Sequence, residues 1–120
     1  MIGIMSKPDR SAVVQFKPRH SDLEKTIRSV ALDSKNVRWR AQGYETHCES
    51  RMEWRDITDR MMFEVLRTGY IKGDIEPGRK PGEWKVKMVK QMKGTREIGV
   101  VTVVINCQRL FVKTVEWEDL

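Results

Sequence analysis

Hydrophobic positions follow a helical period in the first half of the chain and a strand period in the second half. Residues 1–20 show neither period, so the sequence predicts an irregular lead-in there, followed by a single domain over residues 21–120. Ser21 and Asp22 are typical of a helix start, because their side chains accept hydrogen bonds from the free amides of a first turn. The apolar stripe of this first helix comprises Leu23, Ile27, Val30 and Ala31.

Two more helices are predicted before residue 70. The first covers about residues 45–54 and is interrupted by Asp56. The second begins at Thr58 or Asp59, both capping residue types, and ends at Gly69, where glycine favours a left-handed stop position. Its buried side is formed by apolar residues at helical spacing, namely Ile57, Met61, Met62, Val65 and Leu66.

From Tyr70 onward the period changes to two, which is typical of strands with one buried face. Strands are predicted at residues 70–75, 84–89, 98–105 and 110–117, and segment 76–83 contains proline and glycine turns. Segment 98–105 is apolar on both faces, as expected for a central strand, and residues 37–39 are interpreted as a short extended link. The predicted fold class is therefore α+β, with two to three N-terminal helices packed on one face of a small antiparallel sheet of three to four strands.

Composition favours a soluble globular protein, with 33% charged and 39% hydrophobic residues. No apolar run approaches the roughly 20 residues needed to span a bilayer, so we expect a cytoplasmic protein without a membrane partner. The only cysteines, Cys48 and Cys107, are not in a Cys-x-x-Cys pair, and His20 and His47 are the only histidines. This set argues against a zinc site, and the sequence predicts neither a metal nor another cofactor.

The net charge of +6 is concentrated in one segment. Residues 79–96 hold seven positive side chains and one negative side chain, Glu83, which gives that segment a net charge of +6. A concentrated basic surface favours an acidic partner, with nucleic acid as the first candidate. The alternative is a lysine-rich solvent face that keeps edge strands from aggregating.

His47, Arg51 and Arg55 are spaced four residues apart. In a helix this spacing places them on one face, about one turn apart. A proton-transfer group beside two permanent cations suits the binding, and the cleavage, of a phosphodiester. The alternative is an amphipathic helix whose solvated face happens to carry these side chains.

A wider pattern contains the same residues. It reads H-x-x-x-R-M-x-x-R-x-I, V-L-x-x-G and T-V, and it is formed by His47, Arg51, Met52, Arg55, Ile57, Val65, Leu66, Gly69, Thr114 and Val115. This pattern, over about residues 37–117, resembles a small bacterial domain family of unassigned function that is related in layout to RelE, BrnT and MqsR type toxins. The family usually has glycine after the second arginine, whereas this chain has Asp56, which affects where Arg55 points.

The resemblance implies a RelE-like fold and a toxin-like, metal-independent endoribonuclease that acts on single-stranded RNA. It also implies a cognate antitoxin with a helix-turn-helix or zinc-ribbon module. His47 is then the acid or base, and Arg51 and Arg55 bind the phosphate. RNA-binding side chains are expected on the basic segment and the last strand, at Arg79, Lys80, Lys85, Lys87 and Thr114.

Trp84 and Trp117 are candidates for stacking an unpaired base, and the alternative for Trp84 is a place in the core. Either arginine of the motif could instead pair with Glu116 or Asp119 and hold the helix to the sheet. A non-catalytic module that binds RNA or protein through the same basic face is the alternative to the enzyme.

Overall fold

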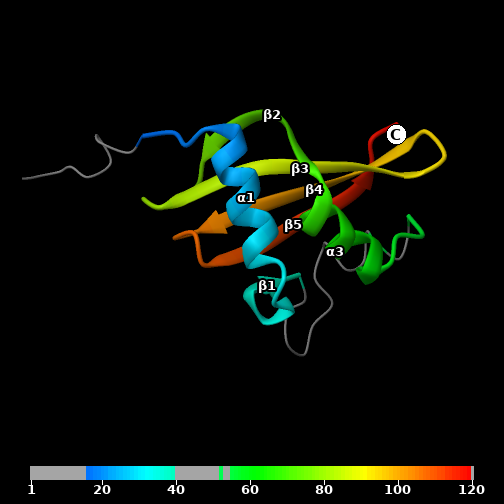
Figure 1. Cartoon of the computed structure of the whole chain (residues 1–120), viewed down its shortest axis with the longest axis horizontal. Helices are drawn as coiled ribbons and strands as arrows, with labels where there is room; N and C mark the ends of the chain where they lie inside the picture. The colour runs from blue at the N-terminus through cyan, green and yellow to red at the C-terminus, as the bar shows by residue number, and fades with distance from the viewer. Residues whose placement is uncertain (1–15, 40–51, 53–54, 120) are drawn as a thin grey trace, which may run out of the picture.

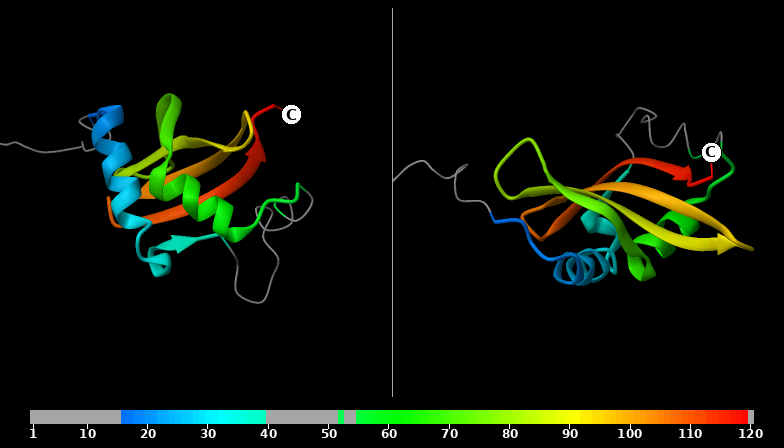
Figure 2. Two further views of the ribbon diagram at one scale, coloured as in Figure 1. Left: turned by 45° about the vertical axis from the view of Figure 1, so that its right-hand side comes forward. Right: turned by 90° about the horizontal axis from the view of Figure 1, so that it is seen from above.

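The computed structural model describes residues 16–39, 52 and 55–119. Its elements are α1 (His20–Val30), η2 (Ser34–Asn36), β1 (Val37–Arg38), α3 (Asp59–Thr68), β2 (Tyr70–Pro77), β3 (Glu83–Lys93), β4 (Arg96–Ile105) and β5 (Arg109–Trp117). The strands form one sheet in the order β1-β5-β4-β3-β2, and α1 and α3 lie on the same side of it (Figure 1). Seen from above, the other side of the sheet carries no described helix or strand (Figure 2).

The sheet differs from the predicted one in size and direction. Strands β2 to β5 form the expected antiparallel meander, but β1 adds a fifth strand that runs parallel to β5. The prediction of two to three helices on an antiparallel, RelE-like sheet of three to four strands is therefore wrong: the sheet is mixed and dominates the described part. Two residues cannot show a period, and β1 pairs through Val37 and Arg38 with residues far along the chain, so no local pattern revealed it.

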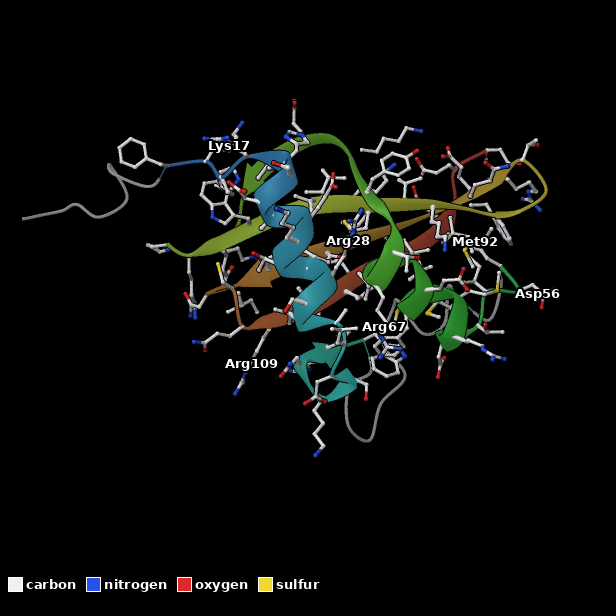
Figure 3. All side chains as sticks on the ribbon, viewed as in Figure 1. Lys17, Arg28, Asp56, Arg67, Met92 and Arg109 are labelled. Carbon is white, nitrogen blue, oxygen red and sulfur yellow. The ribbon has the colours of Figure 1, made fainter. Side chains whose placement is uncertain are left out.

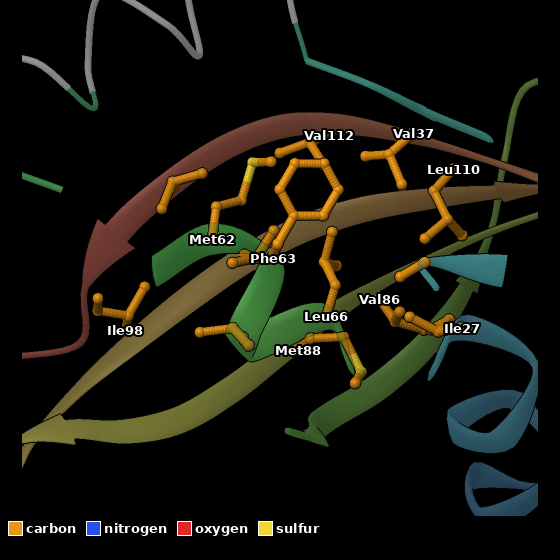
Figure 4. Close-up of a cluster of buried hydrophobic side chains, with 14 of the residues drawn as sticks. Ile27, Val37, Met62, Phe63, Leu66, Val86, Met88, Ile98, Leu110 and Val112 are labelled. Carbon is orange, nitrogen blue, oxygen red and sulfur yellow. The ribbon is translucent and has the colours of Figure 1, made fainter. Parts of the chain in front are cut away.

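The core lies between the helices and the inner face of the sheet (Figure 4). Strand β4 is the middle strand, as its apolar composition predicted. Ile98, Val100 and Val104 are fully buried toward the helices, whereas Val101 and Val103 on the other face are half-buried. Alternation within β4 therefore places apolar side chains on both faces, and only one of these faces is covered by helices.

Helix α3 begins as predicted but ends differently. The Thr58 hydroxyl accepts a hydrogen bond of 3.2 Å from the Met61 amide, which caps the first turn. Gly69 is extended, with φ −83°, and not left-handed. A Cβ at this position would lie 2.5 Å from the Val65 carbonyl oxygen and 2.6 Å from that of Val89. Glycine is required here because the helix end approaches the backbone of β3 closely.

Two arginines join the helices to each other (Figure 3). Arg28 of α1 donates hydrogen bonds of 3.0 and 2.5 Å to the Gly69 carbonyl that follows α3. Arg67 of α3 donates a 2.7 Å hydrogen bond to the Ala31 carbonyl that follows α1. Each guanidinium satisfies a carbonyl that a helix end leaves without an intrahelical partner. The helix starts at His20, one residue before the predicted cap.

Candidate nucleic-acid interface

We call the side of the sheet away from α1 and α3 the open face. On β3, Val86 and Met88 are buried in the core, and the alternation of the strand turns Lys85 and Lys87 to the open face. The sequence predicted this alternation. The lysines therefore share a face with the half-buried residues of β4, so cations and apolar groups are neighbours across the strand pair.

A bulge in β5 places two adjacent side chains on the same face. Val101 of β4 pairs with Thr114 of β5, but the next residue of β4 pairs with Val112, so Lys113 is the extra residue. An extra residue interrupts the alternation of a strand. Lys113 and Thr114 can thus both lie on the open face, although they are adjacent in sequence.

A groove of about 540 Å³ lies on the open face, where β3 begins and β4 ends. We call it the cationic groove, and its main lining residues are Arg79, Lys85, Lys113, Val103, Ile105 and Phe111. Glu76 and Glu83 also line it, and the Glu83 carboxylate accepts a 3.2 Å hydrogen bond from the Arg79 amide. None of the three cationic side chains forms an ion pair with a residue that the structure describes.

The opposite end of the open face carries a network that we call the paired cluster: Tyr70, Lys72, Lys87, Glu97, Glu116 and Glu118. Its centre is Glu118, whose side chain is only 9% exposed and lies 3.4 Å from the Lys72 ammonium and 3.1 Å from that of Lys87. Gly99 makes room for this carboxylate, since a Cβ there would collide with it. Carboxylates therefore neutralise Lys87, in contrast to the cations of the cationic groove.

Two ionisable groups at this end have shifted pKa values. The Tyr70 hydroxyl donates a 2.7 Å hydrogen bond to Glu97, which raises the pKa of Tyr70; burial and the nearby carboxylates act in the same direction. Hydrogen bonds from Arg96 lower the pKa of Asp119 below its usual value. The first contact joins β2 to β4, and the second joins the residues after β5 to β4.

Arg55, the one motif arginine within the described residues, contacts the backbone of β5. Its guanidinium donates a 2.6 Å hydrogen bond to the Val115 carbonyl, and its own carbonyl accepts a 2.8 Å hydrogen bond from the Trp117 indole. Trp117 is 6% exposed, with the Arg96 guanidinium 4.1 Å from its ring centre, so it offers no free ring face to a base. Arg55 thus holds the segment before α3 to the sheet.

The RNA-binding residues expected from the sequence do not share one place. Arg79 and Lys85 line the cationic groove, Lys87 belongs to the paired cluster, and Lys80 lines a hollow behind the β2–β3 connection. Thr114 lies on the open face opposite Val101. The other two predicted catalytic residues, His47 and Arg51, lie outside the described residues.

Sequence reasoning missed Phe111 and Lys113, which are the contribution of β5 to the groove. A signal for them was present: residues 109–113 alternate, and this period of two puts both residues on the face opposite Leu110 and Val112. Both residues lie outside the basic segment 79–96, on which the prediction of cationic RNA-binding side chains was based.

No group of three or more histidine, cysteine, aspartate or glutamate residues is placed to hold a metal ion within residues 16–39, 52 and 55–119. Cys107, in the turn between β4 and β5, is exposed. No helix in the described ranges combines the length and the apolar character needed to cross a bilayer.

We compared the chain with models of protein families, with curated proteins and with solved structures, and none of them matched. The toxin resemblance therefore rests on the motif residues alone, and of its three candidate catalytic residues only Arg55 lies among those that the structure describes. The open face, with its cationic groove, is the feature from which a function can be argued.

Proposed function

We propose that this chain is a module that binds single-stranded RNA on the open face of its sheet, with the cationic groove as the central contact. The observation that carries the proposal is the contrast in pairing. Arg79, Lys85 and Lys113 line one groove without an ion-pair partner among the described residues, while Lys72 and Lys87 on the same face are neutralised. Unpaired cations that converge on a groove attract phosphates.

The apolar part of the groove favours a single strand over a duplex. Val103, Ile105 and Phe111 are half-buried and form a patch between the cations. A duplex presents phosphates and sugars and keeps its bases stacked, whereas a single strand exposes base faces that can pack on an aromatic ring. The groove offers both kinds of contact, so an unpaired strand uses its lining more fully.

Strand cleavage is a further proposal, not carried by the described geometry. Cleavage would rest on His47 and Arg51, and it requires that these two side chains reach the RNA strand bound in the cationic groove. The binding assay below therefore includes electrophoresis of the RNA after incubation with EDTA, for wild type and His47→Ala. Cleavage that depends on His47 would add the predicted metal-independent endoribonuclease to the binding function, together with the need for an antitoxin.

The test is RNA affinity measured by fluorescence anisotropy over a range of salt concentrations. Lys85→Glu/Lys113→Glu reverses two groove cations, and Lys25→Glu/Arg60→Glu reverses two exposed cations on the helices with the same change in net charge. Each phosphate contact to a single strand contributes about 0.7 to the slope of log affinity against log salt, so the groove variant should lose about 1.4 of that slope. The helix variant should keep the slope of the wild type.

Equal losses in the two variants would show that bulk charge and not the groove attracts RNA. An absence of salt-dependent binding by the wild type would also remove the proposal. Binding of an acidic peptide, with no binding of RNA, would assign the groove to a protein partner instead.

A further inference from the structure

A second hollow, of about 380 Å³, lies beside the cationic groove. It is lined by Lys17, Lys80, Pro81 and Trp84, and it shares Pro77, Gly78 and Arg79 with the groove. The shared residues belong to the end of β2 and the connection to β3, so the two concavities adjoin across this connection. Lys17 precedes α1 and lies near the start of that helix (Figure 3).

The wall between the two concavities is held by hydrogen bonds. The Gly78 amide donates to the Glu83 carbonyl at 2.8 Å, and the Glu83 amide donates to the Lys80 carbonyl at 3.1 Å. Gly82 has φ +85°, a left-handed conformation that favours glycine, and its carbonyl accepts a 3.0 Å hydrogen bond from the Asn106 amide. The connection is thereby tied to both its own strand and the β4–β5 turn, so the hollow is formed before any ligand arrives.

The chemistry of the hollow combines an aromatic ring with cations. Trp84 is half-buried, packs partly against the core and lines the hollow with the rest of its surface. Lys17, Arg79 and Lys80 line the same hollow, and they form no ion pair with a described residue. Among the residues that the structure describes, no carboxylate lines the hollow. An indole with ammonium groups around it suits a flat, uncharged ring that carries a phosphate beside it.

We propose that this hollow is a base-stacking subsite: one unpaired base of the bound strand packs on Trp84, and Lys17 and Lys80 contact the phosphates that flank it. The inference rests on the proposed function, because the strand reaches the hollow from the cationic groove across Arg79. In this arrangement the bound RNA strand runs from the cationic groove over the β2–β3 connection, and one of its nucleotides occupies the hollow beyond that connection.

The test compares two probes of equal length, a labelled oligouridylate and a strand of abasic units with the same phosphates. The wild type should bind the oligouridylate more tightly. Trp84→Leu should weaken oligouridylate binding about tenfold, which is within the usual range for the loss of one stacked base, and should leave binding of the abasic strand unchanged. Trp84→Phe keeps a ring and should retain most of the preference. Lys17→Gln/Lys80→Gln should weaken both probes.

Phe16→Leu is the matched control, because Phe16 is a neighbouring aromatic residue that is 84% exposed and does not line the hollow. If Trp84→Leu fails to fold, the wild type decides the question: irradiation of a bromouridine strand should cross-link the peptide that contains Trp84.

Cross-links confined to other peptides, or equal losses for Phe16→Leu and Trp84→Leu, would overturn the subsite. Salt-dependent binding that needs Lys85 and Lys113 but is indifferent to Trp84, Lys17 and Lys80 would remove the subsite and leave the proposed function standing. A wild type that binds neither probe would remove both.

Discussion

The two ends of the open face use the same residue types in opposite ways. At one end, Lys72 and Lys87 surround Glu118, which is nearly buried over Gly99. At the other end, Lys85 and Lys113 line a groove with an apolar floor and have no ion-pair partner among the described residues. The number of lysines in the sequence does not distinguish the two paired side chains from the two unpaired ones.

The difference comes from where the C-terminal residues lie. Glu116 lies at the end of β5 and Glu118 follows it, beside the middle of β3 and the start of β2, so they reach Lys87 and Lys72. The start of β5 carries Phe111 and Lys113 instead, so the other end of the sheet gains a further cation and an aromatic ring. Pairing stabilises the fold at one end, and unpaired charge leaves the other end available to a ligand.

The largest effect should come from removing the central carboxylate of the paired cluster. We expect Glu118→Ala to lower the free energy of unfolding by about 2 kcal/mol, because the nearly buried carboxylate makes charge-assisted contacts with two partly exposed ammonium groups. Glu76→Ala, in the cationic groove, should change it by less than about 0.5 kcal/mol. Chemical denaturation of both variants measures the difference.

Glu118→Ala should also remove one of the two carboxylate partners of Lys72 and of Lys87, so the net positive charge at this end and the RNA affinity at low salt should rise. Equal stability losses at positions 118 and 76, or an unchanged affinity, would show that the two ends of the open face do not differ in the way described.

A smaller effect is expected at Gly99. Gly99→Ala displaces the Glu118 carboxylate, and the loss of its ion pairs is partly offset by the lower chain entropy of alanine in the unfolded state. We expect a net destabilisation of about 1 kcal/mol from these opposing terms, measured by the same denaturation. In a Glu118→Ala background, the same substitution should be neutral or stabilising. Identical costs in the two backgrounds would mean that Gly99 serves the backbone and not the carboxylate.

The smallest effect is a titration. In a Tyr44→Phe background only Tyr70 remains, and its absorbance change should show a pKa above the usual value, because Glu97 accepts a hydrogen bond from the neutral hydroxyl. Since the folded-state pKa is raised, the stabilising contribution is present below the unfolded-state pKa of Tyr70 and is lost as pH rises through the folded-state pKa. Glu97→Gln should move the pKa back toward its ordinary value. A pKa that ignores this substitution would place the tyrosine outside the paired cluster.

Local patterns predicted the elements whose causes are local. The cap at Thr58, the alternation of Lys85 and Lys87 and the central place of residues 98–105 each follow from side chains within a few residues of one another. The catalytic hypothesis for His47 and Arg51 also came from local spacing, and it stays a prediction. Gly69 shows the limit: the sequence indicated a helix end, but the reason for glycine was the backbone of β3.

The sequence by itself determined that helices precede a run of strands around one core, with an excess of positive charge between residues 79 and 96. Only the tertiary structure decided which of those charges are available. Ion pairs form between residues that strand pairing brings together, and Lys87 and Glu118 meet because β3, β4 and β5 are neighbours, not because of any spacing along the chain. The parallel strand β1, the bulge at Lys113 and the groove arise in the same way, because register over long sequence separations creates them.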